Sequence, residues 1–276
     1  MTHRPSPRPT FEGPTAIPHA AATRFLWGDA ESGEVPDWIY VSSDKLHVLV
    51  FALPPGGAFR HSDAYRTVFA ADELYYVLEG TLVIANPETG EVHKAEPGES
   101  VFFRRDTWHH AFAYGTEQLR VLEFLAPPPS TGSTGAYART KPNLTASRYA
   151  DDALLGRWPA ASREVTMSVL REPDALWRLD GGVLVGILVS TEHLTVGTMR
   201  LLPGQKSAVE AHPGDECLYV LDRTLNVRAW EGDESPCLEL GPRDAFYAPA
   251  GARHEYHNVS DRRVAAIFGV APSYRE

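Results

Sequence analysis

Short apolar runs separated by turn residues dominate the hydrophobic pattern of the chain. In the first part they include residues 38–41, 47–51, 74–84, 100–103 and 119–124, and in the second part residues 183–189, 194–201, 218–227, 245–248 and 264–270. Sequences rich in Pro, Gly, Asn and Glu lie between them, as in Pro54-Pro55-Gly56-Gly57. Many short strands with turn chemistry between them are typical of an antiparallel sandwich or barrel. The pattern therefore predicts an all-β protein with little helix.

One segment of the chain occurs twice. Residues 72–83 align without gaps on residues 215–226, and a Glu in each copy (Glu73, Glu216) precedes a His (His109, His254) at a similar distance. A repeat of this kind indicates a duplicated domain. We expect a loosely attached proline-rich arm at 1–20, a first barrel at 21–125, a linker at 126–145 and a second barrel at 146–276.

The second half carries two spaced motifs. They read Gly204-x5-Glu210-x-His212-x3-Glu216-x6-Arg223 and Pro249-x-Gly251-x2-His254-x3-Asn258. These resemble the two sequence motifs of the cupin superfamily, and the two copies cover most of the chain, so the protein resembles a bicupin. The resemblance implies two tandem antiparallel jelly-roll barrels. It specifies the function poorly, because one fold hosts many chemistries.

The residues of the second motif pair also suit a metal ion. His212 and Glu216 are four apart, so a regular strand would place both side chains on one face, and His254 would return on a neighbouring strand. Two imidazoles and a carboxylate with open positions suit Fe(II), Mn, Zn or Ni. Glu210 stands where cupins usually have their first metal-binding His, so it is either a fourth ligand or a catalytic base. The extra carboxylate favours one Fe(II) or Mn ion per chain.

The first half departs further from the motif. Thr67 and Phe69 occupy the positions of the His-x-His pair, which leaves Glu73 and His109. An insertion before Glu73 contains His61, which could return toward these two residues. We therefore expect at most a second, weaker site made of His61, Glu73 and His109.

Charge and composition exclude several classes of protein. The formal net charge is −10, with no basic run, so nucleic acid and membrane surfaces are not expected partners. Two cysteines do not form a disulfide framework, and no apolar stretch is long enough to span a bilayer. We expect a cytoplasmic protein that binds a small-molecule substrate, with a homodimer as one arrangement that would pair exposed barrel edges.

Three functions fit the sequence. The first is a metal-dependent enzyme acting on a small organic metabolite, as a non-haem Fe(II)-type dioxygenase, because two His and a carboxylate with vacant positions suit oxygen chemistry. The alternative is a metal-dependent isomerase, decarboxylase or lyase acting on a sugar or hydroxy acid, with Glu210 as a free base. The second alternative is a non-catalytic cupin that binds or stores a small molecule.

Overall fold

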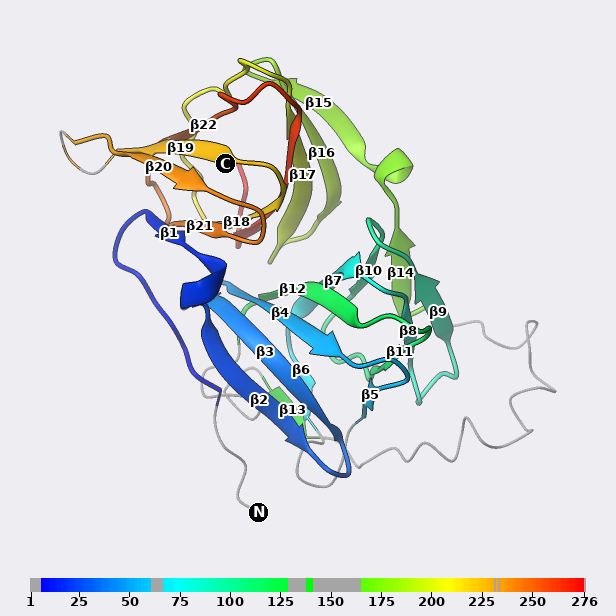
Figure 1. The fold of residues 1–276 in the computed structure, drawn as a ribbon. Helices are drawn as coiled ribbons and strands as arrows, with labels where there is room; N and C mark the ends of the chain where they lie inside the picture. Colours follow the sequence, from blue (N-terminus) through cyan, green and yellow to red (C-terminus); the bar gives the residue numbers. More distant parts are fainter. Residues whose placement is uncertain are drawn as a thin grey trace.

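The computed structural model describes residues 6–60, 67–128, 138–140, 165–230, 232 and 234–275, and for residues 67, 68 and 138–140 it describes the backbone alone. Two β-barrels lie one above the other in Figure 1. Each consists of a seven-stranded antiparallel sheet and a smaller sheet. The predicted all-β class and the pair of tandem barrels are confirmed.

The strands of the first barrel form two sheets. The large sheet has the order β14 (Met167–Leu170), β10 (Ser100–Phe103), β7 (Asp72–Glu79), β12 (Leu119–Ala126), β4 (His47–Leu53), β3 (Gly33–Ser42) and β2 (Thr23–Asp29). The small sheet has the order β5 (Ala58–Phe59), β11 (His110–Ala113), β8 (Leu82–Ala85) and β9 (Val92–Ala95). A further pair joins β6 (Thr67–Phe69) to β13 (Ala138–Thr140), which lies within the expected linker.

The second barrel repeats this plan. Its large sheet has the order β1 (Thr15–Ile17), β21 (Ala245–Ala248), β18 (Asp215–Asp222), β23 (Val264–Ala271), β17 (Thr195–Leu201), β16 (Val183–Ser190) and β15 (Leu176–Asp180). Its small sheet has the order β20 (Cys237–Leu240), β19 (Leu225–Ala229) and β22 (His254–His257). Two short 3-10 helices, η1 (His19–Ala21) and η3 (Glu172–Asp174), precede β2 and β15.

The two halves exchange an edge strand. β1 precedes the first barrel in the sequence but pairs with β21 of the second barrel, and β14 precedes the second barrel but pairs with β10 of the first (Figure 1). Residues 6–20 differ from the expected loose arm, because β1 adds a strand to a sheet and the Phe11 ring lies 5.9 Å from that of Tyr247. The expected boundary at 145/146 is displaced for the same reason, since residues 167–170 still belong to the first sheet.

The central strands are buried on both faces because alternate apolar residues pack into two different cores. In β7, Tyr75 and Val77 belong to the core inside the first barrel, whereas Leu74 and Tyr76 belong to a core shared by both barrels. This is the two-residue period of a strand with apolar contacts on each side. A Cβ at Gly269 would lie 2.3 Å from Cδ1 of Phe124, so the close approach of the sheets requires glycine there. The large sheets therefore fix the position of each barrel interior relative to the other.

Candidate metal centre

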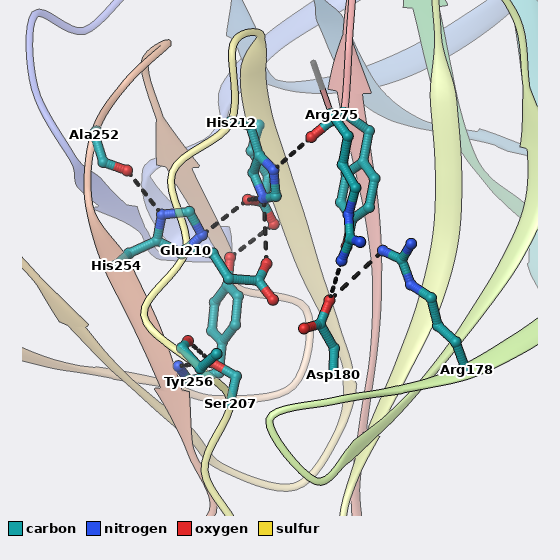
Figure 2. A network of polar contacts seen from close by, with 12 residues as sticks. Arg178, Asp180, Ser207, Glu210, His212, Ala252, His254, Tyr256 and Arg275 are labelled. Atoms are coloured by element: carbon teal, nitrogen blue, oxygen red, sulfur yellow. Dashed lines mark hydrogen bonds and ion pairs between the residues drawn. The ribbon is translucent and has the colours of Figure 1, made fainter.

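Four predicted side chains meet inside the second barrel. Glu216 lies on β18 and His254 begins β22, while Glu210 and His212 lie in the segment before β18. Ligand atoms of Glu210, His212 and His254 all lie within 4.8 Å of one another. Oε2 of Glu216 lies 3.1 Å from Nε2 of His212 and 3.0 Å from Nε2 of His254. Figure 2 shows the side chains of Glu210, His212 and His254 directed toward a common point.

The position of His212 does not depend on strand parity, which was the basis of the prediction. It is not part of a strand in the structure, which places β18 at Asp215–Asp222. Its backbone carbonyl accepts a hydrogen bond from Gly251 N–H, which ties the segment to the turn before His254. Glu210 forms an isolated bridge with His254, with reciprocal backbone hydrogen bonds of 2.8 and 2.9 Å. Cross-strand neighbours of this kind place their side chains on the same face.

Hydrogen bonds to the backbone fix the orientation of both imidazoles. Nδ1 of His212 lies 3.0 Å from the carbonyl oxygen of Tyr274, and Nδ1 of His254 lies 3.0 Å from that of Ala252. Since a carbonyl oxygen only accepts, each Nδ1 carries the proton, and each Nε2 is directed into the site. This arrangement, with the outer nitrogen held by a carbonyl, is common for histidines that bind a metal through the other nitrogen.

The fourth side chain, that of Glu216, is oriented by a hydrogen bond from Tyr256. The hydroxyl of Tyr256 donates a 2.7 Å hydrogen bond to Oε1 of Glu216, which directs Oε2 toward the imidazoles. Oε2 of Glu216 and Nε2 of His254 are both buried, and neither has a hydrogen-bond partner among the described residues. Buried polar atoms without partners are unfavourable, and a cation between them would satisfy both. The residues therefore fit a divalent transition metal.

Charge interactions within the site agree with this interpretation. Burial alone would raise the pKa of Glu216, but the imidazoles of His254 and His212 lower it well below its usual value. Burial would lower the pKa of His212, but the carboxylates of Glu216 and Glu210 outweigh burial and raise it to about 10. The site thus favours an ionised Glu216 together with positive charge, which a bound cation supplies.

A pocket of about 570 Å³ opens next to these residues. Glu210 and His212 line it, together with Tyr274, Arg275 and Asp180. The Tyr274 ring stacks on that of His212, with centroids 4.6 Å apart. The sequence patterns did not indicate Tyr274 or the two charged residues, because they come from β15 and the chain end, outside both motifs.

Two arginines lie beside Asp180 on this side of the site, as Figure 2 shows. Arg275 donates a 2.7 Å hydrogen bond to Asp180, and Nη2 of Arg178 lies 3.6 Å from the same carboxylate oxygen. The guanidinium of Arg178 lies 4.8 Å from the ring centroid of Tyr274, and its Nε is buried without a partner among the described residues. Two guanidinium groups, one of them from the pocket lining, therefore share the single carboxylate of Asp180.

The corresponding place in the first barrel has a different composition. The hydroxyl of Tyr75 lies 3.0 Å from Nε2 of His109, while the nearest Glu73 oxygen is 4.0 Å away. The Phe103 ring packs 4.6 Å from the His109 ring, where the second barrel has the small Ala248. Burial and the neighbouring Glu123 raise the pKa of Glu73 well above its usual value, and a protonated carboxyl is a poor cation ligand. His61 lies outside the described residues, so the weaker second site stays a prediction.

Comparison with known proteins gives the family. The model of the cupin domain matches residues 49–125 and 197–270, which together are more than half of the chain. The chain belongs to the cupin family, and its two barrels make it a bicupin. A comparison with curated protein sequences found no significant match. No helix in the described part of the chain is long and apolar enough to cross a membrane.

Solved structures with the same fold include several bicupins. A protein from Pseudomonas aeruginosa, described as glyoxylate-induced, aligns with a TM-score of 0.67 at 14% identity over 98% of this chain and 94% of its own. Oxalate decarboxylase from Lactobacillus farciminis, in complex with formate, gives 0.64 at 15% identity over 99% and 90%. Oxalate decarboxylase from Bacillus subtilis gives 0.64 at 13% identity over 99% and 80%. A further structure of the Bacillus subtilis enzyme concerns its Mn(II) centres. At these identities the similarity shows the fold.

Proposed function

We propose that the chain is a metal-dependent decarboxylase of small carboxylic acids, with its catalytic site in the second barrel. One observation carries the proposal: two imidazole Nε2 atoms and the Glu216 carboxylate converge beside a pocket that a further carboxylate, Glu210, lines. The similarity to two oxalate decarboxylases supports this chemistry over the other reactions that the sequence allowed.

His212, Glu216 and His254 would hold the metal. Two nitrogen donors and a carboxylate suit Mn(II) or Fe(II), and Mn is favoured because a structural relative contains Mn(II) centres. A divalent ion bound there would polarise a substrate carboxylate and stabilise the negative charge that develops as CO2 leaves.

Glu210 is the residue that we assign to proton transfer. Loss of CO2 breaks a carbon–carbon bond, and a proton must replace the carboxyl group on the remaining carbon. Glu210 lies at the pocket with a side chain that is 12% exposed, and its Oε2 contacts Nε2 of His212 at 3.4 Å. It lacks the close contact with both imidazoles that Glu216 has. A carboxyl group beside the substrate, partly shielded from water, can hold a proton at Oε2 and deliver it.

Arg275, which lines the pocket, and Arg178, which lies next to Asp180, would bind a second acidic group of the substrate. Guanidinium groups form paired, charge-assisted hydrogen bonds with carboxylates. Arg275 and Arg178 already lie against one carboxylate, that of Asp180, and a substrate carboxylate could replace part of this contact. This feature favours dicarboxylic or hydroxy acids over neutral sugars.

The test is a substrate survey on protein loaded with Mn(II) or Fe(II). Oxalate, malonate, and short hydroxy and keto acids are supplied while CO2 release and net O2 uptake are recorded together. CO2 release without net O2 uptake supports the proposal. The absence of CO2 release from every acid, with metal bound in stoichiometric amount, refutes it.

The second candidate is a non-haem Fe(II) dioxygenase. The donor set of two His and one carboxylate favours it, because that set leaves positions free for dioxygen. Net O2 uptake that depends on substrate and on Fe(II) in the same survey would replace the decarboxylase proposal with this one. Binding of an acid without turnover under either metal would favour the non-catalytic binding protein.

A further inference from the structure

A second cavity lies between the two barrels, away from the metal centre. Its volume is about 200 Å³, which corresponds to roughly seven water molecules at the volume each has in the liquid. Its polar lining comes from His19, Tyr76, Glu79, Arg120, Tyr219 and Arg243. We call it the inter-barrel cavity. Residues from η1, from the first barrel and from the second barrel all contribute to it.

Arg120 lines this cavity and has one N–H group, at Nε, without a hydrogen-bond partner among the described residues. Its side chain is half-buried, and the Nε atom itself is buried. The guanidinium lies 4.8 Å from the ring centroid of Trp38, a contact that holds it in place but satisfies none of its N–H groups. A buried cationic donor without an acceptor is unfavourable unless an anion or water completes it.

Arg243 lies in a backbone conformation that favours glycine. Its φ is 74°, in the left-handed region, and its N–H donates to the carbonyl of Val220. The equivalent residue of the first barrel is Gly98, with φ 90° and the same hydrogen bond to Val77. A non-glycine residue in this conformation is strained, which is a reason to look for a function of its side chain.

The guanidinium of Arg243 crosses from the second barrel to the first. It forms a 2.7 Å ion pair with Glu79, but both side chains are 46% exposed, so water weakens the pair. The Arg243 carbonyl accepts a 2.7 Å hydrogen bond from Tyr40, whose oxygen in turn lies 2.7 Å from Nδ1 of His19. His19 is thereby oriented at the edge of the same cavity. Asp244 accepts the backbone N–H of His19 and is the other acidic group nearby.

We propose that the inter-barrel cavity binds a small oxyanion, a carboxylate or a phosphate, through the guanidinium groups of Arg120 and Arg243. Guanidinium groups suit the paired oxygens of both anions, and both arginines line the cavity. The volume of about 200 Å³ matches a small anion. The anion would join the two barrels, because each supplies one arginine. This site is separate from the metal centre and does not depend on the proposed function.

The first experiment measures binding by calorimetry at low ionic strength, with inorganic phosphate and malonate as probes. The wild-type chain and the full-length His212→Ala chain are compared, since malonate could also bind a metal ion in the second barrel. We expect one probe ion per chain in His212→Ala, with affinity reduced about tenfold or more in Arg120→Gln on the same background. Arg228→Gln, at an arginine on β19 that does not line the cavity, is the matched control and should bind as before.

The second experiment uses Arg243→Gly, which restores the residue that the first barrel has at this turn. Without probe, the variant should melt at a higher temperature than the wild type, because backbone strain is relieved. With probe, the rise in melting temperature seen in the wild type should be lost. A higher melting temperature without probe, together with the loss of the probe-induced rise, tests the proposal even if Arg120→Gln fails to fold.

The outcomes separate the sources of the anion. Binding of phosphate alone indicates a phosphate site, binding of malonate alone indicates an organic acid site, and binding of both supports the shared oxyanion chemistry. Unchanged affinity in Arg120→Gln and Arg243→Gly, or no binding of either probe at millimolar concentration, overturns the proposal.

Discussion

Oε2 of Glu216 lies 3.0 Å from Nε2 of His254, yet neither atom forms a hydrogen bond with any described residue. Their contact is that of an ion pair, which requires a protonated imidazole. Both are buried, so the site without a cation leaves two unsatisfied groups in the barrel interior. Metal binding should therefore stabilise the second barrel as well as supply its chemistry.

The first prediction concerns the metal content of His212→Ala. Removing one of two imidazoles should reduce bound metal from about one ion per chain to a small fraction, because the remaining donors are too few to hold it. Elemental analysis of protein purified without oxygen measures this. His109→Ala is the control and should retain most of the metal. Loss of half the metal in the control would instead show that both barrels are loaded.

A second prediction follows from the hydrogen bond between Tyr256 and Glu216. Tyr256→Phe removes only the hydroxyl, so the barrel packing should remain while Oε2 of Glu216 is less well directed. We expect metal affinity to fall about 10- to 100-fold, the usual effect of removing a group that orients a ligand. Competition with a coloured chelator gives the affinity. Tyr247→Phe is the control, since Tyr247 donates to Asp215 and not to a proposed ligand.

The third prediction separates the two roles open to Glu210. Glu210→Gln should keep about one metal ion per chain, because His212, Glu216 and His254 remain. Turnover should fall by about 10²- to 10⁴-fold, since an amide cannot deliver the proton. Parallel measurement of metal content and CO2 release shows whether Glu210 transfers the proton or binds the metal. If metal is lost together with turnover, Glu210 is a ligand and another group transfers the proton.

Sequence periodicity predicted the barrels but not the exchange of edge strands between them. β7 and β18 are eight-residue strands with a repeated motif, and the predicted runs 74–84 and 218–227 cover most of each. Each run also contains a second strand, β8 or β19, which the apolar pattern did not separate. β1 and β14 have only three and four residues, too few to show a period. Their partners lie far away in the sequence, so neither could be assigned to a barrel before the structure was known.

The cluster of proposed metal ligands was predictable from the sequence, whereas the walls of the adjacent pocket were not. His212, Glu216 and His254 are marked by spacing, even though His212 lies outside a strand. Its position depends on contacts with Gly251 and Tyr274, which come from distant parts of the chain. Arg178 and Arg275 carry no local signal at all. Such residues reach a site through tertiary folding alone, and single-sequence patterns do not report them.

The last prediction concerns acid stability and the buried His47 of β4. Burial, aided by the charge of Arg8, lowers the pKa of His47 to about 4, whereas an unfolded chain has about 6.5. The unfolded state therefore binds the proton first as the pH falls, and the stability present above pH 6.5 is lost progressively down to pH 4. The pKa difference corresponds to about 3 kcal/mol of unfolding free energy. In His47→Gln, the loss between pH 7 and pH 4 should be smaller by about this amount, measured by urea denaturation in the presence of a chelator. His193→Gln, at a surface histidine beside Glu192, is the control; an acid dependence in His47→Gln equal to that of the wild type would contradict the prediction.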